Sequence, residues 1–348
     1  MRDLLVVGGG PVGLATALHA ADAGLDVAVL EPRGGPVDKA CGEGLMPGAV
    51  HRLAALGVDP PGVDLRGIGY LDGPRRAEAR FRGAPGRGVR RTTLHDALAG
   101  RVAQVGVPVE AHRVRTVDVR EDRVVVDGLE ARYLVAADGL HSPVRRMLGL
   151  RARERASSRR HGGGRRRFGQ RLHVATAPWS DLVEVHWGER SEAYVTPVAP
   201  DLVGVAVLTD VQAPLERLLA DFPALLERLG GSERTTVRGA GPLRQATRRR
   251  TAGRVLLAGD AAGYVDALTG EGIALGLADA EASVAAVAAG DPAGYEGEWR
   301  RRHRRHDLLT RSLLGVSSRP RLRRALVPTA QHLPWAFSAA VEQMARPA

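Results

Sequence analysis

The chain of 348 residues has one lysine, Lys39, and one cysteine, Cys41. A single cysteine excludes an internal disulfide and fits a reducing compartment, so we expect a cytoplasmic protein. No apolar run approaches the roughly 20 residues that span a bilayer, which predicts no stable membrane insertion. The segment after Ser317 mixes apolar and basic residues, and we expect a packed cap there, with weak contact to a membrane surface as the alternative.

Aromatic residues are scarce and negative charge is outweighed. Aromatics make up 4% of the chain, too few for a platform on which nucleic-acid bases stack, and the formal net charge is +11. Almost all of the positive charge is arginine, and its densest stretches, 159–167 and 300–305, are typical of solvated loop and helix faces. We therefore expect a small-molecule substrate and no nucleic-acid partner. The histidines lack the spacing of metal ligands, so no metal site is predicted, and no particular oligomeric state is predicted either.

A glycine-rich turn lies between the first apolar segment, residues 3–7, and an alanine-rich helix. The turn contains Gly8, Gly10, Pro11 and Gly13. This GxGxxG spacing lets the backbone approach a pyrophosphate, whose charge the helix N-terminus stabilises. Glu31 ends a second apolar strand, where a carboxylate accepts hydrogen bonds from ribose hydroxyls. Strand, turn, helix and carboxylate together predict a dinucleotide site.

Two more apolar strands end in a pair of aspartate and glycine. The pairs are Asp138 with Gly139, after residues 133–136, and Gly259 with Asp260, after residues 255–258. Ligands bind at the carboxyl ends of the strands in open α/β sheets, so both pairs are candidate ligand contacts. Gly270, Gly272 and Ile273 then begin a long helix of small residues, whose N-terminus carries a partial positive charge.

In this order and at these separations, the three motifs resemble the group A flavoprotein monooxygenases and the related geranylgeranyl reductases, which share the p-hydroxybenzoate hydroxylase fold. The resemblance extends from Asp3 to about Ala288. It implies FAD as the cofactor and NADPH or NADH as the reductant. It also implies that the glycine-rich turn and Glu31 bind the ADP half of FAD, and that Asp138 with Gly139 form the Asp-Gly motif of the family.

The resemblance implies three further FAD contacts. Asp260 is expected to hydrogen-bond the ribityl chain, and residues 270–273 to cradle the pyrimidine end of the flavin. Arg91, followed by Leu94 and Leu98, matches a helix start in the family whose arginine reaches FAD.

The strand pattern and the resemblance together predict an α/β fold. We expect a Rossmann-like FAD-binding domain similar to that of glutathione reductase, interrupted by an antiparallel sheet for the substrate and closed by a helical C-terminal cap. The expected boundaries are 1–165 for the first part of the FAD domain, with substrate-side segments at 60–90, 166–240 for the sheet, 241–290 for the second part, and 291–348 for the C-terminal helices.

The resemblance implies an FAD-dependent oxidoreductase. The first hypothesis is an NAD(P)H-dependent monooxygenase of secondary metabolism that hydroxylates an aromatic or polyketide-like small molecule. The alternative is a flavin ene-reductase similar to the geranylgeranyl reductases, and a non-catalytic nucleotide-binding module is the third. The chain departs from flavin halogenases, because no lysine follows Lys39. Residues 193–198 keep a tyrosine and a proline of the reductase motif Tyr-x-Trp-x-Phe-Pro but lack its aromatic pair.

Four residues are candidates for catalysis: Cys41, His173, His186 and Tyr194. The resemblance places Cys41 along the flavin, and we expect it to pack there, because the chain has no second thiol for a dithiol cycle. The two histidines are candidate general bases that face the pocket, and Tyr194 is a candidate proton donor.

Overall fold

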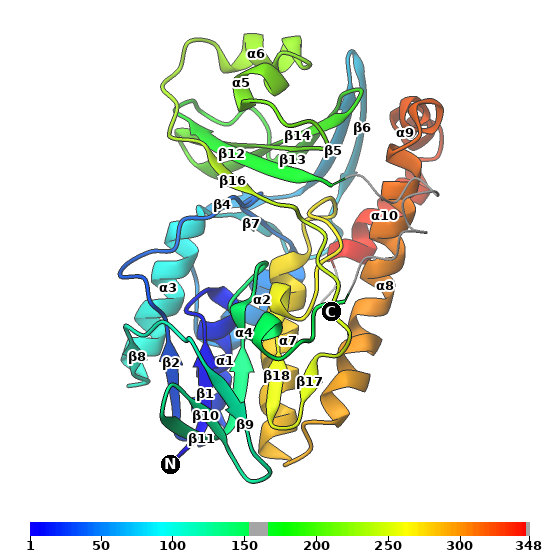
Figure 1. Ribbon diagram of the computed structural model, residues 1–348. Coiled ribbons are helices and arrows are strands. Elements are labelled where there is room, and N and C mark those ends of the chain that lie inside the picture. The colour runs from blue at the N-terminus through cyan, green and yellow to red at the C-terminus, as the bar shows by residue number, and fades with distance from the viewer. Residues whose placement is uncertain (153–165, 346–348) are drawn as a thin grey trace.

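The computed structural model of the chain describes residues 1–152 and 166–345 (Figure 1). Within these residues the chain forms three β-sheets and ten α-helices. Most of the basic stretch at 159–167, and the expected domain boundary at residue 165, lie outside the described residues. The expected α/β fold with a mixed Rossmann-like sheet, an antiparallel sheet and C-terminal helices is confirmed.

The first sheet runs in the order β17-β18-β11-β1-β2-β8, with β10 and β9 attached beside β11. Its strands are β1 (Arg2–Val7), β2 (Val27–Leu30), β8 (Val109–Glu110), β9 (Val117–Val119), β10 (Val124–Val126), β11 (Leu129–Ala136), β17 (Thr251–Ala252) and β18 (Val255–Leu257). The central strands are parallel and their apolar residues are buried, as expected for a parallel sheet covered by other elements on both faces.

The helices packed around the first sheet fix the positions of the carboxyl ends of its strands. The helices of this part are α1 (Pro11–Asp22), α2 (Pro47–Ala55), α3 (Arg91–Gln104), α4 (Pro143–Met147) and α7 (Gly272–Ala288). The short 3₁₀ turn η2 (Gly259–Ala261) follows β18. A Cβ atom on Gly259 or Gly276 would lie 2.9 or 2.5 Å from a methyl group of Val12, so these glycines let η2 and α7 pack closely against α1.

The second sheet runs in the order β16-β12-β15-β14-β13-β5-β6. Its strands are β5 (Gly67–Asp72), β6 (Arg75–Arg80), β12 (Phe168–Val174), β13 (Leu182–Trp187), β14 (Ser191–Ala199), β15 (Leu202–Thr209) and β16 (Arg238–Ala240). All neighbours are antiparallel except β13 and β5, which are parallel. A small third sheet, β3 (Gly44–Leu45), β4 (Val63–Leu65) and β7 (Gly86–Gly88), lies between the two large ones (Figure 1).

The two faces of the second sheet bury different things. Side chains alternate across a strand, so Ala193 and Val195 point to one face and Tyr194 to the other. The first face packs under α5 (Leu215–Leu219) and α6 (Pro223–Leu229). The second packs against Leu268 of the loop that precedes α7 and against Phe337 near the C-terminus.

Three helices complete the chain: α8 (Gly294–Ser317), α9 (Pro320–His332) and α10 (Pro334–Ala345). Helix α8 packs along α7, and α9 and α10 pack on β5 and β6, so this region joins the two large sheets (Figure 1). No helix of the described residues is long and apolar enough to cross a membrane.

Candidate functional site

The glycine-rich turn between β1 and α1 is as tight as its sequence predicts. Gly8 has a φ of +107°, and a Cβ atom there would lie 2.5 Å from the carbonyl oxygen of Ala137 at the end of β11. A Cβ atom on Gly13 would lie 1.8 Å from the carbonyl oxygen of Gly8. Neither position has room for a side chain, so the turn brings its backbone N–H groups close to the strand ends.

Glu31 is buried at the end of β2 and faces this turn. Its carboxylate accepts a hydrogen bond from the Gly9 N–H at 2.7 Å and three from Arg33, through the backbone N–H and the guanidinium. Burial opposes ionisation, but the bonds from Arg33 and Gly9 outweigh it and lower the pKa of Glu31. Four bonds fill the accepting capacity of a carboxylate, so a ribose at Glu31 has to displace the half-exposed Arg33 guanidinium.

Arg91 and Asp138 present unpaired polar atoms beside the turn. The Nη2 atom of Arg91 lies 3.9 Å from the place of a Cβ atom on Gly10. The Nε atom of Arg91 and the Oδ1 atom of Asp138 are buried without a hydrogen-bond partner among the described residues. The other oxygen of Asp138 accepts the N–H of Val144 at the start of α4. Buried polar atoms are rarely left unpaired, so these two mark a place for a polar ligand.

Arg145 joins the two aspartate–glycine segments, a role that the sequence analysis missed. Its guanidinium is buried and donates to the carbonyl oxygens of Asp260 at 3.1 Å, Ala261 at 3.0 Å and Leu140 at 2.7 Å. It also donates to the Gln245 side chain. Arg145 belongs to the segment 137–145 that follows β11, but nothing local in that sequence indicates a partner more than a hundred residues away.

Asp260 lies among cations. Burial raises the pKa of its carboxyl, and the charges of Arg91, Lys39 and Arg145 oppose that rise. The Nζ atom of Lys39 lies 3.2 Å from the place of a Cβ atom on Gly139, which has a φ of +84°. The one lysine of the chain thus lies at the candidate site, among the motifs that the sequence singled out.

The end of the η2 loop leads into α7. Gly270 has a φ of +70° and lies 3.9 Å from the Met46 methyl group, counted from the place of its Cβ atom. Gly272 begins α7, and Ile273 packs against the apolar core around the first sheet. The N–H groups of this first helical turn have no partners within the helix, so they offer donors and a partial positive charge to a ligand.

Glu43 connects the cysteine loop to the second sheet, and the sequence analysis missed it as well. This residue is buried and has a φ of 59°, which is rare for a residue other than glycine. Its carboxylate accepts the N–H of Arg91 at 2.8 Å and meets the Nε2 atom of His173 at 2.6 Å. Arg171, also buried, lies 3.5 Å away. His173 is therefore engaged in holding the loop against β12, which leaves it poorly placed as a general base.

Cys41 lies on the same loop. Its sulfur accepts the N–H of Glu43 at 3.4 Å, and burial raises the pKa of the thiol.

The remaining two candidates lie on opposite faces of the second sheet. His186 pairs in register with Ala193 and packs edge-on against Phe222, the residue before α6, at 6.5 Å between ring centroids. The prediction that His186 faces the pocket is wrong, because the alternation of β13 turns it to the outer face. Tyr194 faces inward, and its hydroxyl donates to the carbonyl oxygen of Leu268 at 3.0 Å.

These observations fit FAD. The turn, Glu31, Arg91, Lys39 and the two aspartate–glycine segments converge at the carboxyl ends of parallel strands, with two orphaned polar atoms and several cations for a pyrophosphate. Among residues 1–152 and 166–345 no group of histidine, cysteine and acidic side chains has the arrangement of a metal site.

The comparisons with known proteins agree with this geometry. Residues 3–58 match the family model described as FAD dependent oxidoreductase. The chain is 30% identical over 335 residues to a menaquinone reductase of Mycolicibacterium smegmatis, covering 85% of this chain and 79% of the relative. It is 25% identical over 321 residues to digeranylgeranylglycerophospholipid reductase 1 of Methanothermobacter thermautotrophicus, covering 83% of this chain and 78% of the relative.

A solved structure shows the same fold. The anhydrotetracycline hydroxylase OxyS from Streptomyces rimosus superposes with a TM-score of 0.75 at 23% identity, covering 99% of this chain and 75% of that one. At that identity the likeness concerns the fold alone.

Proposed function

This chain belongs to the superfamily of FAD-dependent oxidoreductases that includes the geranylgeranyl reductases and the flavin monooxygenases, and from that premise we propose that it reduces a carbon–carbon double bond in an isoprenoid lipid. The proposal takes up the alternative of the sequence analysis in place of hydroxylation, because the two relatives named above, each matched over more than three quarters of its length, are reductases.

The observation that carries the proposal is the apolar cluster beside the loop between η2 and α7. Leu268 lies two residues before Gly270 and packs in one cluster with Met46, Trp187 and Phe337. Tyr70 adds an edge-on contact to Trp187, with 5.3 Å between ring centroids. These side chains are buried against one another, so an isoprenoid chain, which offers only methyl, methylene and alkene groups, would have to part them and would then be held by burial of apolar area.

The names of the two relatives support the same class of substrate. Menaquinone and digeranylgeranylglycerophospholipid differ in their head groups, but both carry isoprenoid chains with repeated double bonds. An enzyme that recognises the chain more than the head group fits an apolar surface without a cluster of polar ligands.

FAD held by the glycine-rich turn, Glu31 and Arg91 would, once reduced by NADPH or NADH, provide the hydride for one carbon of the double bond. The other carbon then needs a proton, so that one hydride and one proton add across the bond. Our candidate proton donor is Tyr194, which faces inward from the second sheet and whose hydroxyl would have to exchange its bond to the Leu268 carbonyl oxygen for the substrate. Burial raises its pKa well above the usual value, which keeps the phenol protonated as an acid.

The other residues of the site hold and orient. Arg91 and Lys39 would supply positive charge for the pyrophosphate, and Glu31 would accept hydrogen bonds from the ribose hydroxyls in place of those from Arg33. The first turn of α7, from Gly272, stabilises negative charge at the pyrimidine end. The Glu43–His173 pair keeps the cysteine loop closed on the second sheet.

The test is turnover of defined substrates by protein reconstituted with FAD. Under anaerobic conditions with NADPH or NADH, menaquinone or a geranylgeranyl lipid should gain two hydrogens per double bond reduced, as measured by mass spectrometry. Tyr194→Phe should lower the rate about 100-fold, within the usual range for losing a general acid, while FAD binding stays unchanged. Unchanged turnover in this variant would remove Tyr194 from the mechanism.

Oxygen separates the proposal from hydroxylation. A reductase should be reoxidised slowly by oxygen, so reduced protein mixed with oxygen should keep its reduced spectrum for seconds or longer. Fast reoxidation, together with an oxygen atom incorporated into a phenolic substrate, would instead support the monooxygenase. Protein that stays colourless after incubation with FAD would support the non-catalytic module.

A further inference from the structure

We propose that α9 and the start of α10 form a docking surface for an anionic lipid bilayer. The surface consists of Arg319, Arg321, Leu322, Arg324, Leu333 and Trp335, which are all exposed and are called the C-terminal patch below. These residues combine positive charge with exposed apolar area, and a bilayer is a binding partner that the proposed reaction does not itself specify.

The patch carries positive charge with little compensation. No acidic residue occurs between Asp307 and Glu342 in the sequence. Arg319 and Arg321 form no ion pair with any described residue, and Arg324 meets only the exposed Glu189, at 3.4 Å. An exposed pair of that kind is screened by solvent and contributes little, so the arginines remain available to lipid phosphates.

Apolar side chains share this surface. Leu322 lies in the first turn of α9, and Leu333 and Trp335 follow the C-terminal end of this helix. Leu322 and Leu333 are each 43% exposed, and Trp335 is 71% exposed. The inner side of α9 buries Val327. A helix with basic and apolar residues on its solvent side, next to an exposed tryptophan, is typical of segments that lie in a membrane interface.

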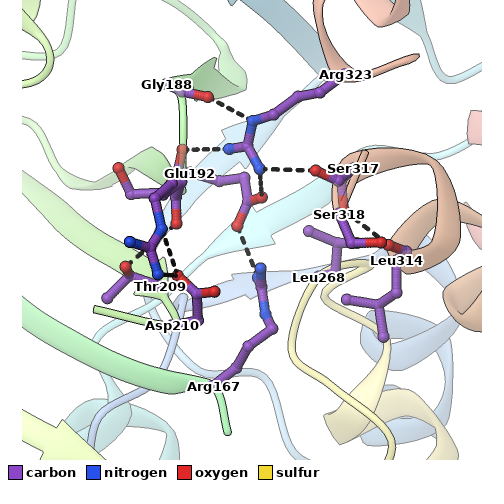
Figure 2. A network of polar contacts seen from close by, with 12 residues as sticks. Arg167, Gly188, Glu192, Thr209, Asp210, Leu268, Leu314, Ser317, Ser318 and Arg323 are labelled. Atoms are coloured by element: carbon purple, nitrogen blue, oxygen red, sulfur yellow. Dashed lines mark hydrogen bonds and ion pairs between the residues drawn. The ribbon is translucent and has the colours of Figure 1, made fainter. Parts of the chain in front are cut away.

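The patch is held firmly to the rest of the molecule (Figure 2). Arg323, buried on the inner side of α9, donates to the carbonyl oxygens of Gly188 and Ser317 and lies 2.9 Å from Glu192. Glu192 in turn pairs with Arg167 at 2.6 Å. Breaking a buried pair strands a charge, so this connection resists any swing of α9 away from the second sheet.

The chain of ion pairs also reaches the loop between η2 and α7. Arg167 donates to Asp266 at 3.0 Å, and Asp266 lies two residues before Leu268. On their inner side, α9 and α10 cover the apolar cluster through Val327 and Phe337. A bilayer at the C-terminal patch therefore lies against the helices that cover the proposed isoprenoid surface. This last step rests on the proposed function, whereas the docking does not.

The test is binding of the FAD-loaded protein to vesicles by co-sedimentation. Vesicles of phosphatidylcholine with 30% phosphatidylglycerol should bind the protein, and vesicles of phosphatidylcholine alone should bind it at least tenfold more weakly. The double variant Arg319→Gln/Arg321→Gln should lower the partition coefficient about 20-fold, since each basic residue near an anionic surface contributes about fivefold.

A matched control separates the patch from the general positive charge. Arg113 and Arg115, between β8 and β9, are exposed and lie at the other end of the molecule from α9 (Figure 1). Arg113→Gln/Arg115→Gln removes the same charge and should lower binding less than threefold. Equal losses in the two double variants would overturn the proposal, as would an absence of binding to the anionic vesicles.

Trp335 reports the orientation. The other tryptophans, Trp179, Trp187 and Trp299, are partly or fully buried, so an emission shift to shorter wavelength on adding anionic vesicles should come from Trp335. Trp335→Phe should bind with a similar partition coefficient and lose the shift. An unshifted spectrum in vesicle-bound wild-type protein would overturn the proposed orientation, and a shift that follows protein concentration without vesicles would assign the patch to a second copy of the chain. Because binding is measured without substrate, failure of the proposed reductase activity leaves this test intact.

Discussion

Two regions meet at the candidate site, and they are built differently. The proposed FAD cradle depends on backbone geometry: Gly8 and Gly13 approach other carbonyl groups too closely for any side chain. The inner face of the second sheet depends on buried side-chain pairs, Glu43 with His173 and Glu192 with Arg167. The first kind of construction tolerates almost no change at its glycines, whereas the second tolerates change only if both partners change together.

The difference has a functional side. In the proposed site, backbone groups would bind parts that every FAD molecule shares, so the cradle would serve a fixed ligand. Side-chain pairs on a sheet position a surface, and the residues between them, such as Tyr70 and Tyr194, set what that surface accepts. Substitutions in the two regions should therefore separate cofactor binding from turnover.

The largest effect is expected from two glycine substitutions. A Cβ atom on Gly13 would lie 1.8 Å from a carbonyl oxygen, and one on Gly88 would lie 1.6 Å from the carbonyl oxygen of Pro197. Gly13→Ala and Gly88→Ala should each lower the free energy of unfolding by about 3 kcal/mol, the upper part of the range for overpacking. Only Gly13→Ala should also weaken FAD binding in the fraction that stays folded, measured by flavin fluorescence.

Gly100→Ala is the matched control for this pair. Gly100 lies within α3, and a Cβ atom there meets nothing within 4 Å, so the change should stabilise the helix by up to about 1 kcal/mol. Normal FAD affinity in Gly13→Ala would count against the cradle.

Glu184 gives the second sheet a pH dependence. Its burial opposes ionisation, but His186, 3.4 Å away, and hydrogen bonds from Trp179 and Arg76 outweigh burial and lower its pKa from 4.5 to about 2. A carboxyl with a depressed pKa stabilises the fold fully above pH 4.5 and loses that contribution as the pH falls towards 2. Glu184→Gln should lower the free energy of unfolding by on the order of 3 kcal/mol at pH 7 and by much less near pH 2.

The comparison for Glu184 is Glu78, which pairs with the same Arg76 at an exposed position. Glu78→Gln should change the free energy of unfolding by less than about 1 kcal/mol at either pH. Denaturant titrations at a series of pH values measure both variants. Parallel curves for Glu184→Gln and wild type between pH 5 and 2 would show that Glu184 does not stabilise the folded sheet as a carboxylate.

Glu31 tests the cradle through a side chain. Glu31→Ala should weaken FAD binding by about 2 kcal/mol, roughly 30-fold, because a hydrogen bond to a charged group is lost. The sequence alone suggests little effect on folding, but the structure adds one: without the carboxylate, the Gly9 N–H loses its partner. We therefore expect a small loss of stability as well, measured by thermal unfolding of the FAD-free protein. Unchanged FAD retention would refute the ribose role of Glu31.

The contrast between the regions also explains what the sequence could predict. Each element of the cradle is local: a strand, a turn with fixed glycine spacing, a helix and the carboxylate of Glu31 all lie within residues 2–31 and together predict a dinucleotide site. The fold class followed from the order of such segments. The roles of Asp138 and Asp260 came from the family resemblance, and the structure brings both near Arg145.

The side-chain network could not be predicted for a physical reason. Glu43 and His173 are 130 residues apart, and Glu192 meets Arg323 from 131 residues away. No local pattern marks such partners, because each depends on how two distant elements pack. His186 shows the complementary error, since a polar residue in a strand does not by itself reveal which face points to the pocket.

The smallest effect is expected at Cys41, where the two regions touch. Its thiol accepts only a long hydrogen bond from Glu43, and burial raises its pKa, so it stays protonated and unreactive at neutral pH. Cys41→Ser keeps an acceptor of similar size, and we expect a loss of stability below about 1 kcal/mol and turnover within threefold of wild type. Measuring turnover and FAD content on the same sample distinguishes the possible results. A large loss of turnover at full FAD content would mean that the thiol takes part in the reaction, and the boundary between the regions would then hold a catalytic group where we assign only packing.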